Sequence, residues 1–284
     1  MSQAVLLTDL DNTLYNWIDY FAPCFRAMVH VIARRTGFDE DVVIGDFRKI
    51  YGEKGSLEYR YPIQELGVCR NLASEDVQKL VYDAWIAFSG TRRNRLKPYE
   101  GVRETLRWAA DAGVRIIGVT NSPLDAAIGR LRQLNIDTFF DGLAAWEGAD
   151  EPESFPSWVN EMIGTRESKA RIKHKWYLPT SDLKPSANSY STIMKDLQLS
   201  GRDTFVIGDS LNKDVAPALE LGAIGIWAKY GTKYEARNFD TLLKITHWDQ
   251  DKIATTYAQD SITPTYTILS FPEIKKVLGV GLPF

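Results

Sequence analysis

Hydrophobic and polar positions follow two different patterns along the chain. Residues 4–7 are four consecutive apolar residues, which is typical of a strand buried on both faces of a parallel sheet. From residue 15 to residue 97, apolar residues instead recur at three- and four-residue steps, the period of amphipathic helices. The second pattern predicts four helices: one that ends near Gly37, one that opens at Phe38, one over residues 57–66, and one capped by residues 74–76.

Apolar runs and helical periods alternate in the rest of the chain. This alternation predicts an α/β fold built on a doubly wound (Rossmann-like) parallel sheet. We therefore predict an α/β core of residues 1–14 and 98–284, with residues 15–97 as an all-helical domain inserted after the first strand. The predicted strands cover residues 114–119, 139–145, 204–207 and 223–228, and the predicted helices cover residues 102–112, 123–134, 186–197 and 211–221.

Two parts of the predicted core depart from the alternation. Residues 146–183 show no clear period, which indicates an irregular insertion, either a partly helical flap or an oligomer contact. Its basic run at residues 171–175 is typical of a solvated face. Residues 231–284 form a C-terminal extension, in which residues 266–269 predict an extra edge strand covered by a short helix that starts at Phe271.

Composition narrows the class of protein. The chain has 284 residues with 44% hydrophobic and 25% charged residues, as in ordinary globular proteins, and a net charge of −3. It lacks the basic excess of nucleic-acid-binding proteins and the apolar runs of about 20 residues that span membranes. Its start does not resemble a signal peptide, and Cys24 and Cys69 are too few for a disulfide framework. We expect a cytoplasmic protein with buried, reduced thiols that binds neither nucleic acid nor a membrane.

Asp9 and Asp11 come directly after the first predicted strand. Open α/β sheets bind ligands at the carboxyl ends of their strands, and residues two apart on an extended backbone share one face. Two carboxylates held this close need a cation between them, a shared proton, or a bend that separates them. The pattern also fits a simple turn, because Asp, Asn and Thr end many strands.

Three further polar motifs follow in the chain. Thr120 and Asn121 end one predicted strand, and Lys184 precedes Pro185 in a loop before a helix. Asp209 ends another strand, and Asp214 follows five residues later. Each motif is weak alone, since the last two aspartates also suit the N-terminus of a helix.

The four motifs in this order resemble the haloacid dehalogenase-like hydrolase superfamily, in the phosphatase type that carries a helical cap after the first strand. The matching stretches are Asp-Leu-Asp-Asn-Thr, Val-Thr-Asn-Ser, Leu-Lys-Pro and Gly-Asp-Ser-Leu-Asn-Lys-Asp. The resemblance implies a Mg²⁺-dependent phosphatase that hydrolyses a small-molecule phosphomonoester through an aspartyl-phosphate. It makes residues 15–97 the cap domain, with hinges near residues 15–20 and 92–98.

The resemblance also implies roles for the two N-terminal carboxylates. Asp9 is the expected nucleophile and a metal ligand. Asp11 is the expected general acid and base, which offers its backbone carbonyl to the metal and keeps its side chain free. A carboxylate at this position favours phosphate chemistry over dehalogenation, because a displaced halide needs no proton. Thr13 is expected to orient the loop.

The remaining motif residues take supporting roles by the same resemblance. Asp209 is an expected Mg²⁺ ligand. Asp214 is expected to lie next to the residues that bind the metal directly, or to bind the metal through a water molecule. Thr120, Asn121 and Lys184 are the expected phosphate-binding residues, because fixed donors and a cation stabilise the charge on the transferring group.

The identity of the substrate depends on the cap. A small phosphorylated metabolite is the expected partner, for a chain that acts as a monomer or a homodimer. Two alternatives remain open: a phosphomutase on a sugar phosphate with the same core, and a non-catalytic binding protein that kept the fold. The candidate residues for a second charged group of the substrate are the cap cations Arg34, Arg35, Lys49, Lys54, Arg60 and Arg70.

Overall fold

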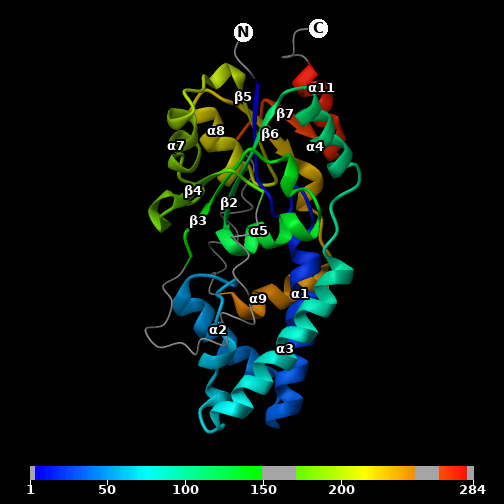
Figure 1. Cartoon of the computed structure of the whole chain (residues 1–284), viewed down its shortest axis with the longest axis vertical. Coiled ribbons are helices and arrows are strands. Elements are labelled where there is room, and N and C mark those ends of the chain that lie inside the picture. The colour runs from blue at the N-terminus through cyan, green and yellow to red at the C-terminus, as the bar shows by residue number, and fades with distance from the viewer. Residues whose placement is uncertain (1–3, 149–170, 247–261, 280–284) are drawn as a thin grey trace.

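The computed structural model describes residues 4–148, 171–246 and 262–279. Within these residues, a seven-stranded parallel sheet has the order β4-β3-β2-β1-β5-β6-β7 (Figure 1). The predicted fold class, a doubly wound α/β sheet, is confirmed. The strands are β1 (Val5–Thr8), β2 (Arg115–Pro123), β3 (Gly142–Trp146), β4 (His174–Leu178), β5 (Thr204–Gly208), β6 (Ile224–Ala228) and β7 (Tyr266–Ile268).

Strand β1 lies in the middle of the sheet and is buried along its whole length. Its side chains alternate between two hydrophobic cores, with Leu6 on one face and Val5 and Leu7 on the other. Two cores are possible because helices cover both faces of the sheet. Helices α4 (Val102–Asp111) and α5 (Leu124–Gln133) cover the Leu6 face, and α7 (Asn188–Asp196) and α8 (Ala216–Glu220) cover the other face.

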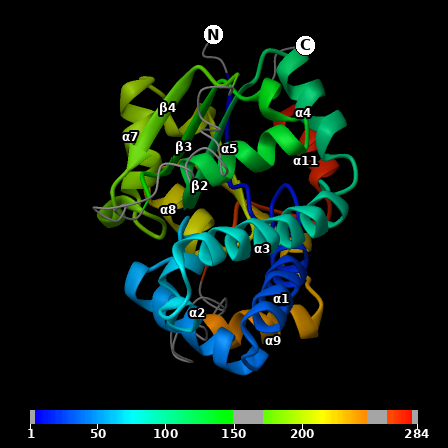
Figure 2. The same ribbon diagram turned by 60° about the horizontal axis from the view of Figure 1, so that its bottom comes forward.

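Three helices from residues 15–97 gather at the end of the molecule away from both termini, and we call this segment the helical module (Figures 1 and 2). Asn16 caps the N-terminus of the first helix, because its side chain accepts from the N–H of Asp19. Gly37 caps the C-terminus of this helix with a φ of 77°, which favours glycine. Aromatic side chains pack between the helices. The rings of Phe25 and Phe47 pack edge to face, with their centroids 5.1 Å apart. The helices are α1 (Trp17–Thr36), α2 (Glu40–Lys54) and α3 (Ser74–Arg95).

One sequence prediction for the helical module is wrong. Residues 57–66 contain no α-helix. They include a short 3₁₀ turn, η1 (Ile63–Glu65), and a second one, η2 (Gly67–Cys69), follows them. Pro62 explains this, because it lacks a backbone donor and disfavours the helical conformation of the residue before it. Helix α3 also runs to Arg95, so most of the predicted hinge at residues 92–98 is helical.

The segment predicted to be irregular, residues 146–183, contains strand β4. This strand pairs in parallel with β3 at one edge of the sheet, so that Trp176 lies opposite Ala144. Four of its five residues are exposed or half-buried, and such an edge strand leaves no continuous apolar run in the sequence. The predicted flap or oligomer contact falls mainly on residues 149–170, which lie outside the described residues. Arg171 and Lys173 of the basic run are exposed, as expected.

The C-terminal extension adds β7 beside β6 at the other edge of the sheet, which confirms the predicted edge strand. The short helix α11 (Ile274–Gly279) follows and packs against α4. The sequence did not predict the place of helix α9 (Ala236–Ile245), which lies against α1 and α2 of the helical module (Figure 2). Arg26 of α1 donates to Thr241 at 2.7 Å and to Asn238 at 2.8 Å, so polar contacts fix α9 to the module.

Cys24 and Cys69 are buried and carry free thiols. Among residues 4–148, 171–246 and 262–279, the structure contains no helix with the length and hydropathy of a membrane span.

Candidate active site

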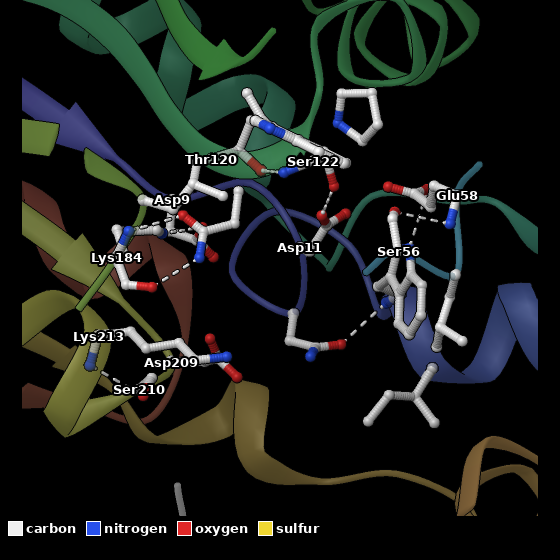
Figure 3. Close-up of a pocket in the computed structure, with 18 of the residues that line it drawn as sticks. Asp9, Asp11, Ser56, Glu58, Thr120, Ser122, Lys184, Asp209, Ser210 and Lys213 are labelled. Carbon is white, nitrogen blue, oxygen red and sulfur yellow. Dashed lines mark hydrogen bonds and ion pairs between the residues drawn. The ribbon is translucent and has the colours of Figure 1, made fainter. Parts of the chain in front are cut away.

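The carboxyl ends of β1, β2 and β5 border a pocket of about 440 Å³ (Figure 3). The chain crosses over at this point, since β2 lies on one side of β1 and β5 on the other, and doubly wound folds bind ligands where the strand order reverses. The pocket therefore lies where the sequence motifs predict a site. The predicted residues that line it are Asp9, Asp11, Thr120, Asn121, Lys184, Asp209 and Asp214.

Asp9 and Lys184 form the centre of the site. Lys184 Nζ donates to Asp9 Oδ1 at 2.5 Å and to Asp214 Oδ1 at 2.7 Å. Thr13 Oγ1 donates to the other Asp9 oxygen at 3.1 Å, and Tyr190 donates to Asp214 at 2.8 Å. Lys184 is buried together with Asp9 and Asp214, so a single ammonium group pairs with two buried carboxylates.

The phosphate-binding candidates lie beside this centre. Asn121 uses its side-chain amide to hold the backbone of Lys184, with an Nδ2–O distance of 2.7 Å and an N–Oδ1 distance of 2.9 Å. Asn121 therefore positions the lysine. Thr120 Oγ1 accepts from the N–H of Ser122 at 3.1 Å, which leaves the threonine hydroxyl hydrogen to be donated.

Asp9, Asp209 and Asp214 form a group of carboxylates with the donor chemistry of a Mg²⁺ site. One oxygen of each lies within 4.8 Å of the others. Burial raises the pKa of Asp9 to about 7 even though Lys184 opposes the shift. Burial and the charges of Asp9 and Asp214 likewise hold the pKa of Asp209 well above its ordinary value. Three acidic groups around one ammonium leave a deficit of positive charge, so these residues fit a hard divalent cation bound by oxygen ligands.

Asp11 lies between this group and Glu58 (Figure 3). Its Oδ2 atom accepts from Ser122 Oγ at 2.6 Å and lies 3.3 Å from an Arg130 nitrogen. Its Oδ1 atom is buried and has no hydrogen-bond partner among the described residues. Burial raises the pKa of the Asp11 carboxyl, and Arg130 opposes this shift. Asp11 therefore lines the pocket while its carboxylate is held through Oδ2.

Sequence reasoning missed the groups that hold these carboxylates, which include Ser122, Arg130 and Tyr190. The signal for Arg130 was its place on α5, where it shares the buried face with Ala127 and Leu131. Among the six cap cations considered, Lys54 is the one in the described residues that lines the pocket, and it pairs with Glu65 at 3.5 Å. The exposed members of the set are Arg34, Arg35, Lys49 and Arg70, while Arg60 is half-buried.

Known proteins are similar to this chain in sequence and in fold. Residues 183–258 match the HAD-hydrolase-like family model. Glyceraldehyde 3-phosphate phosphatase of Methanocaldococcus jannaschii is 24% identical over 222 residues, which are 78% of this chain and 82% of the relative. The enzyme with the same name from Methanopyrus kandleri is 24% identical over 246 residues, which are 84% of this chain and 90% of the relative.

Solved structures with the same fold include a 2-haloacid dehalogenase from Pseudomonas syringae, with a TM-score of 0.60, 15% identity and coverage of 99% of this chain and 100% of that one. A HAD phosphatase from Thermococcus onnurineus has a TM-score of 0.55 and 16% identity, and 98% of each chain is covered. The family-model match and the two relatives named as phosphatases support a hydrolase that acts on phosphate esters. The chain is similar to the haloacid dehalogenase-like hydrolases in its family-model match over residues 183–258 and in its fold.

Proposed function

We propose that this protein is a Mg²⁺-dependent phosphatase that hydrolyses a small phosphomonoester through an aspartyl-phosphate on Asp9. The observation that carries the proposal is the pairing of Asp9 with Lys184 at 2.5 Å in a pocket that Asp11 also lines. A nucleophile and a proton carrier thus border one cavity. Two curated relatives that act as phosphatases support the same activity.

The metal would be held by the carboxylates of Asp9 and Asp209 and by the backbone carbonyl of Asp11, with Asp214 close by. When bound, Mg²⁺ supplies positive charge that offsets the negative charge on the carboxylates and on the transferring phosphoryl group.

The protein's own residues account for both halves of the reaction. Asp9 attacks phosphorus and forms an aspartyl-phosphate, while the bond from phosphorus to the ester oxygen breaks and Asp11 donates a proton to that oxygen. Asp11 then removes a proton from a water that attacks the phosphoryl group, which releases inorganic phosphate and restores Asp9. Lys184, the Thr120 hydroxyl and the Asn121 N–H stabilise the charge on the phosphoryl oxygens.

Residues of the helical module line the pocket, which supports a role as a cap. The stretch from Lys54 to Glu58 lines the pocket opposite the sheet. Helix α9 adds Phe239 and Leu242 to the same wall. A wall of this kind encloses the substrate and limits water, so we propose that the substrate is a small molecule and that residues 15–97 act as the cap.

A panel of small phosphomonoesters tests the proposal. It should contain glyceraldehyde 3-phosphate, a sugar phosphate, a nucleoside monophosphate and phosphoglycolate, each incubated with Mg²⁺. We expect release of inorganic phosphate from at least one substrate and loss of that release after treatment with EDTA. Isomerised product without free phosphate would show a phosphomutase, and a protein inert towards the whole panel would show a binding protein. Either result would overturn the proposal.

A further inference from the structure

Arg130 is a buried cation at the boundary between the α/β core and the helical module. Its side chain is 2% exposed. The guanidinium donates to the hydroxyl of Tyr15 at 2.8 Å and to that of Tyr20 at 3.2 Å. It also pairs with the carboxylates of Asp11, at 3.3 Å, and Glu58. One planar group therefore joins a residue of the catalytic pocket to a residue of the helical module.

The two carboxylates reach Arg130 from different parts of the chain. Asp11 comes from the loop after β1, and Glu58 comes from the stretch after α2 (Figure 3). The Glu58 oxygen that accepts from Arg130, Oε1, also accepts from Trp17 Nε1 at 3.3 Å. A buried guanidinium is costly unless its donors are satisfied, and arginine has the fork geometry to satisfy several acceptors at once. Arg130 can therefore be buried here because both carboxylates are in place.

The contacts to Asp11 fix its direction. Ser122 and Arg130 both bind Oδ2, while Oδ1 has no partner among the described residues. Two donors on one oxygen restrict rotation of the Asp11 carboxylate beside the pocket that this residue lines. Proton transfer requires a carboxyl oxygen within hydrogen-bond reach of the reacting oxygen. The orientation of the Asp11 carboxylate therefore affects the rate of proton transfer to the leaving group.

We propose that Arg130 is a positioning residue that holds Asp11 for proton transfer, and that Glu58 of the helical module holds Arg130 in turn. The inference rests on the proposed function, because it requires Asp11 to protonate the leaving oxygen. It adds that this step depends on contact between the helical module and the core, through one named pair of residues.

The test compares substrates whose leaving groups differ in their need for a proton. An alkyl phosphate needs protonation of its leaving oxygen, whereas 4-nitrophenyl phosphate releases a stable phenolate without it. The parameter is kcat/KM, which reports the steps up to the first bond cleavage. We expect Arg130→Met to lower kcat/KM about 100-fold for the alkyl ester, and Glu58→Gln to lower it about tenfold. The aryl ester should change by less than about threefold in both variants.

A second ion pair between the module and the core provides the matched control. Arg60 of the module lies 3.9 Å from Asp125 on α5. Asp125→Asn should leave the ratio of alkyl to aryl kcat/KM unchanged. Arg130→Lys keeps the positive charge but lacks the forked guanidinium. Its kcat/KM for the alkyl ester should therefore lie between those of wild type and Arg130→Met.

Thermal unfolding identifies variants that fail to fold, and if Arg130→Met is one of them, Glu58→Gln and Arg130→Lys decide the question. Equal losses on the alkyl and aryl esters, an unchanged ratio in all the folded variants, or the same change of ratio in Asp125→Asn would each overturn the inference. Failure of the proposed function looks different, because wild type would then release no phosphate, or Asp9→Asn would keep the activity.

Discussion

Gly208 at the end of β5 lies directly against the carboxylate of Asp214. A Cβ atom at position 208 would come within 2.1 Å of Asp214 Cγ, a distance that real contacts do not show. Asp214 in turn accepts from Lys184 and Tyr190, so the missing side chain at Gly208 makes room for the whole buried group. Asp214 can therefore occupy this position only because residue 208 is a glycine.

Gly208→Ala should displace Asp214 and, with it, the lysine that contacts Asp9. We expect at least a tenfold loss of phosphate release, as about 1 Å of misplacement at a reacting group costs on that order. The free energy of unfolding should fall by about 2 kcal/mol because the group is buried. Gly45→Ala in α2 is the control, since nothing lies within 4 Å of its added Cβ, and alanine favours a helix. Normal activity of Gly208→Ala would contradict this account of the site.

The stability of the metal-free protein should fall as pH rises from about 4 to about 7. Burial raises the pKa of Asp9 from 3.8 to about 7, so in this window the folded protein binds a proton that the unfolded chain has lost. The raised pKa values of Asp11 and Asp209 act in the same direction. Protons and Mg²⁺ compete for these carboxylates.

Mg²⁺ should accordingly raise Tm more at about pH 8 than at about pH 5. Differential scanning fluorimetry with and without Mg²⁺ at both pH values measures this. Asp209→Asn is the matched variant, because it removes one carboxylate from the group and should reduce the Mg²⁺ effect at the higher pH. A Tm shift that is independent of pH would argue against a metal bound by Asp9 and Asp209.

Asn238 should be important for stability because it joins the C-terminal extension to the helical module. Its side chain is fully buried, accepts from Arg26 at 2.8 Å and donates to Asp19 at 2.9 Å. Asn238→Ala leaves both charged partners with one contact fewer, so we expect a loss of about 2 kcal/mol in denaturant unfolding. Asn188→Ala, which removes an exposed side-chain hydrogen bond to Asp182, should cost less than about 0.5 kcal/mol. Equal losses in the two variants would show that α9 does not stabilise the module.

The sequence was sufficient to locate the main motifs of the site because their position follows from strand direction. Asp9, Thr120 and Asp209 each follow an apolar run, and the carboxyl ends of parallel strands meet at one edge of a sheet. Residues 57–66 were mistaken for a helix because apolar spacing outweighed Pro62, whose effect on the backbone is local and strong.

Other features depend on contacts between distant segments, which no local pattern records. An arginine such as Arg130 on a helix is normally solvated, and its burial follows from Asp11 and Glu58, which lie far from it in sequence. Strand β4 was missed because an exposed edge strand needs no apolar run. The contact of α9 with α1 joins residues more than 200 positions apart, as in the bond from Asn238 to Asp19.

The central claim is that Asp9 is the nucleophile. Asp9→Asn keeps the shape of the side chain but removes its charge and most of its nucleophilicity. On a substrate that wild type hydrolyses, phosphate release by Asp9→Asn in saturating Mg²⁺ should fall to the background rate, while the circular dichroism spectrum and cooperative unfolding stay like those of wild type. A folded Asp9→Asn protein that releases phosphate at the wild-type rate would contradict the account.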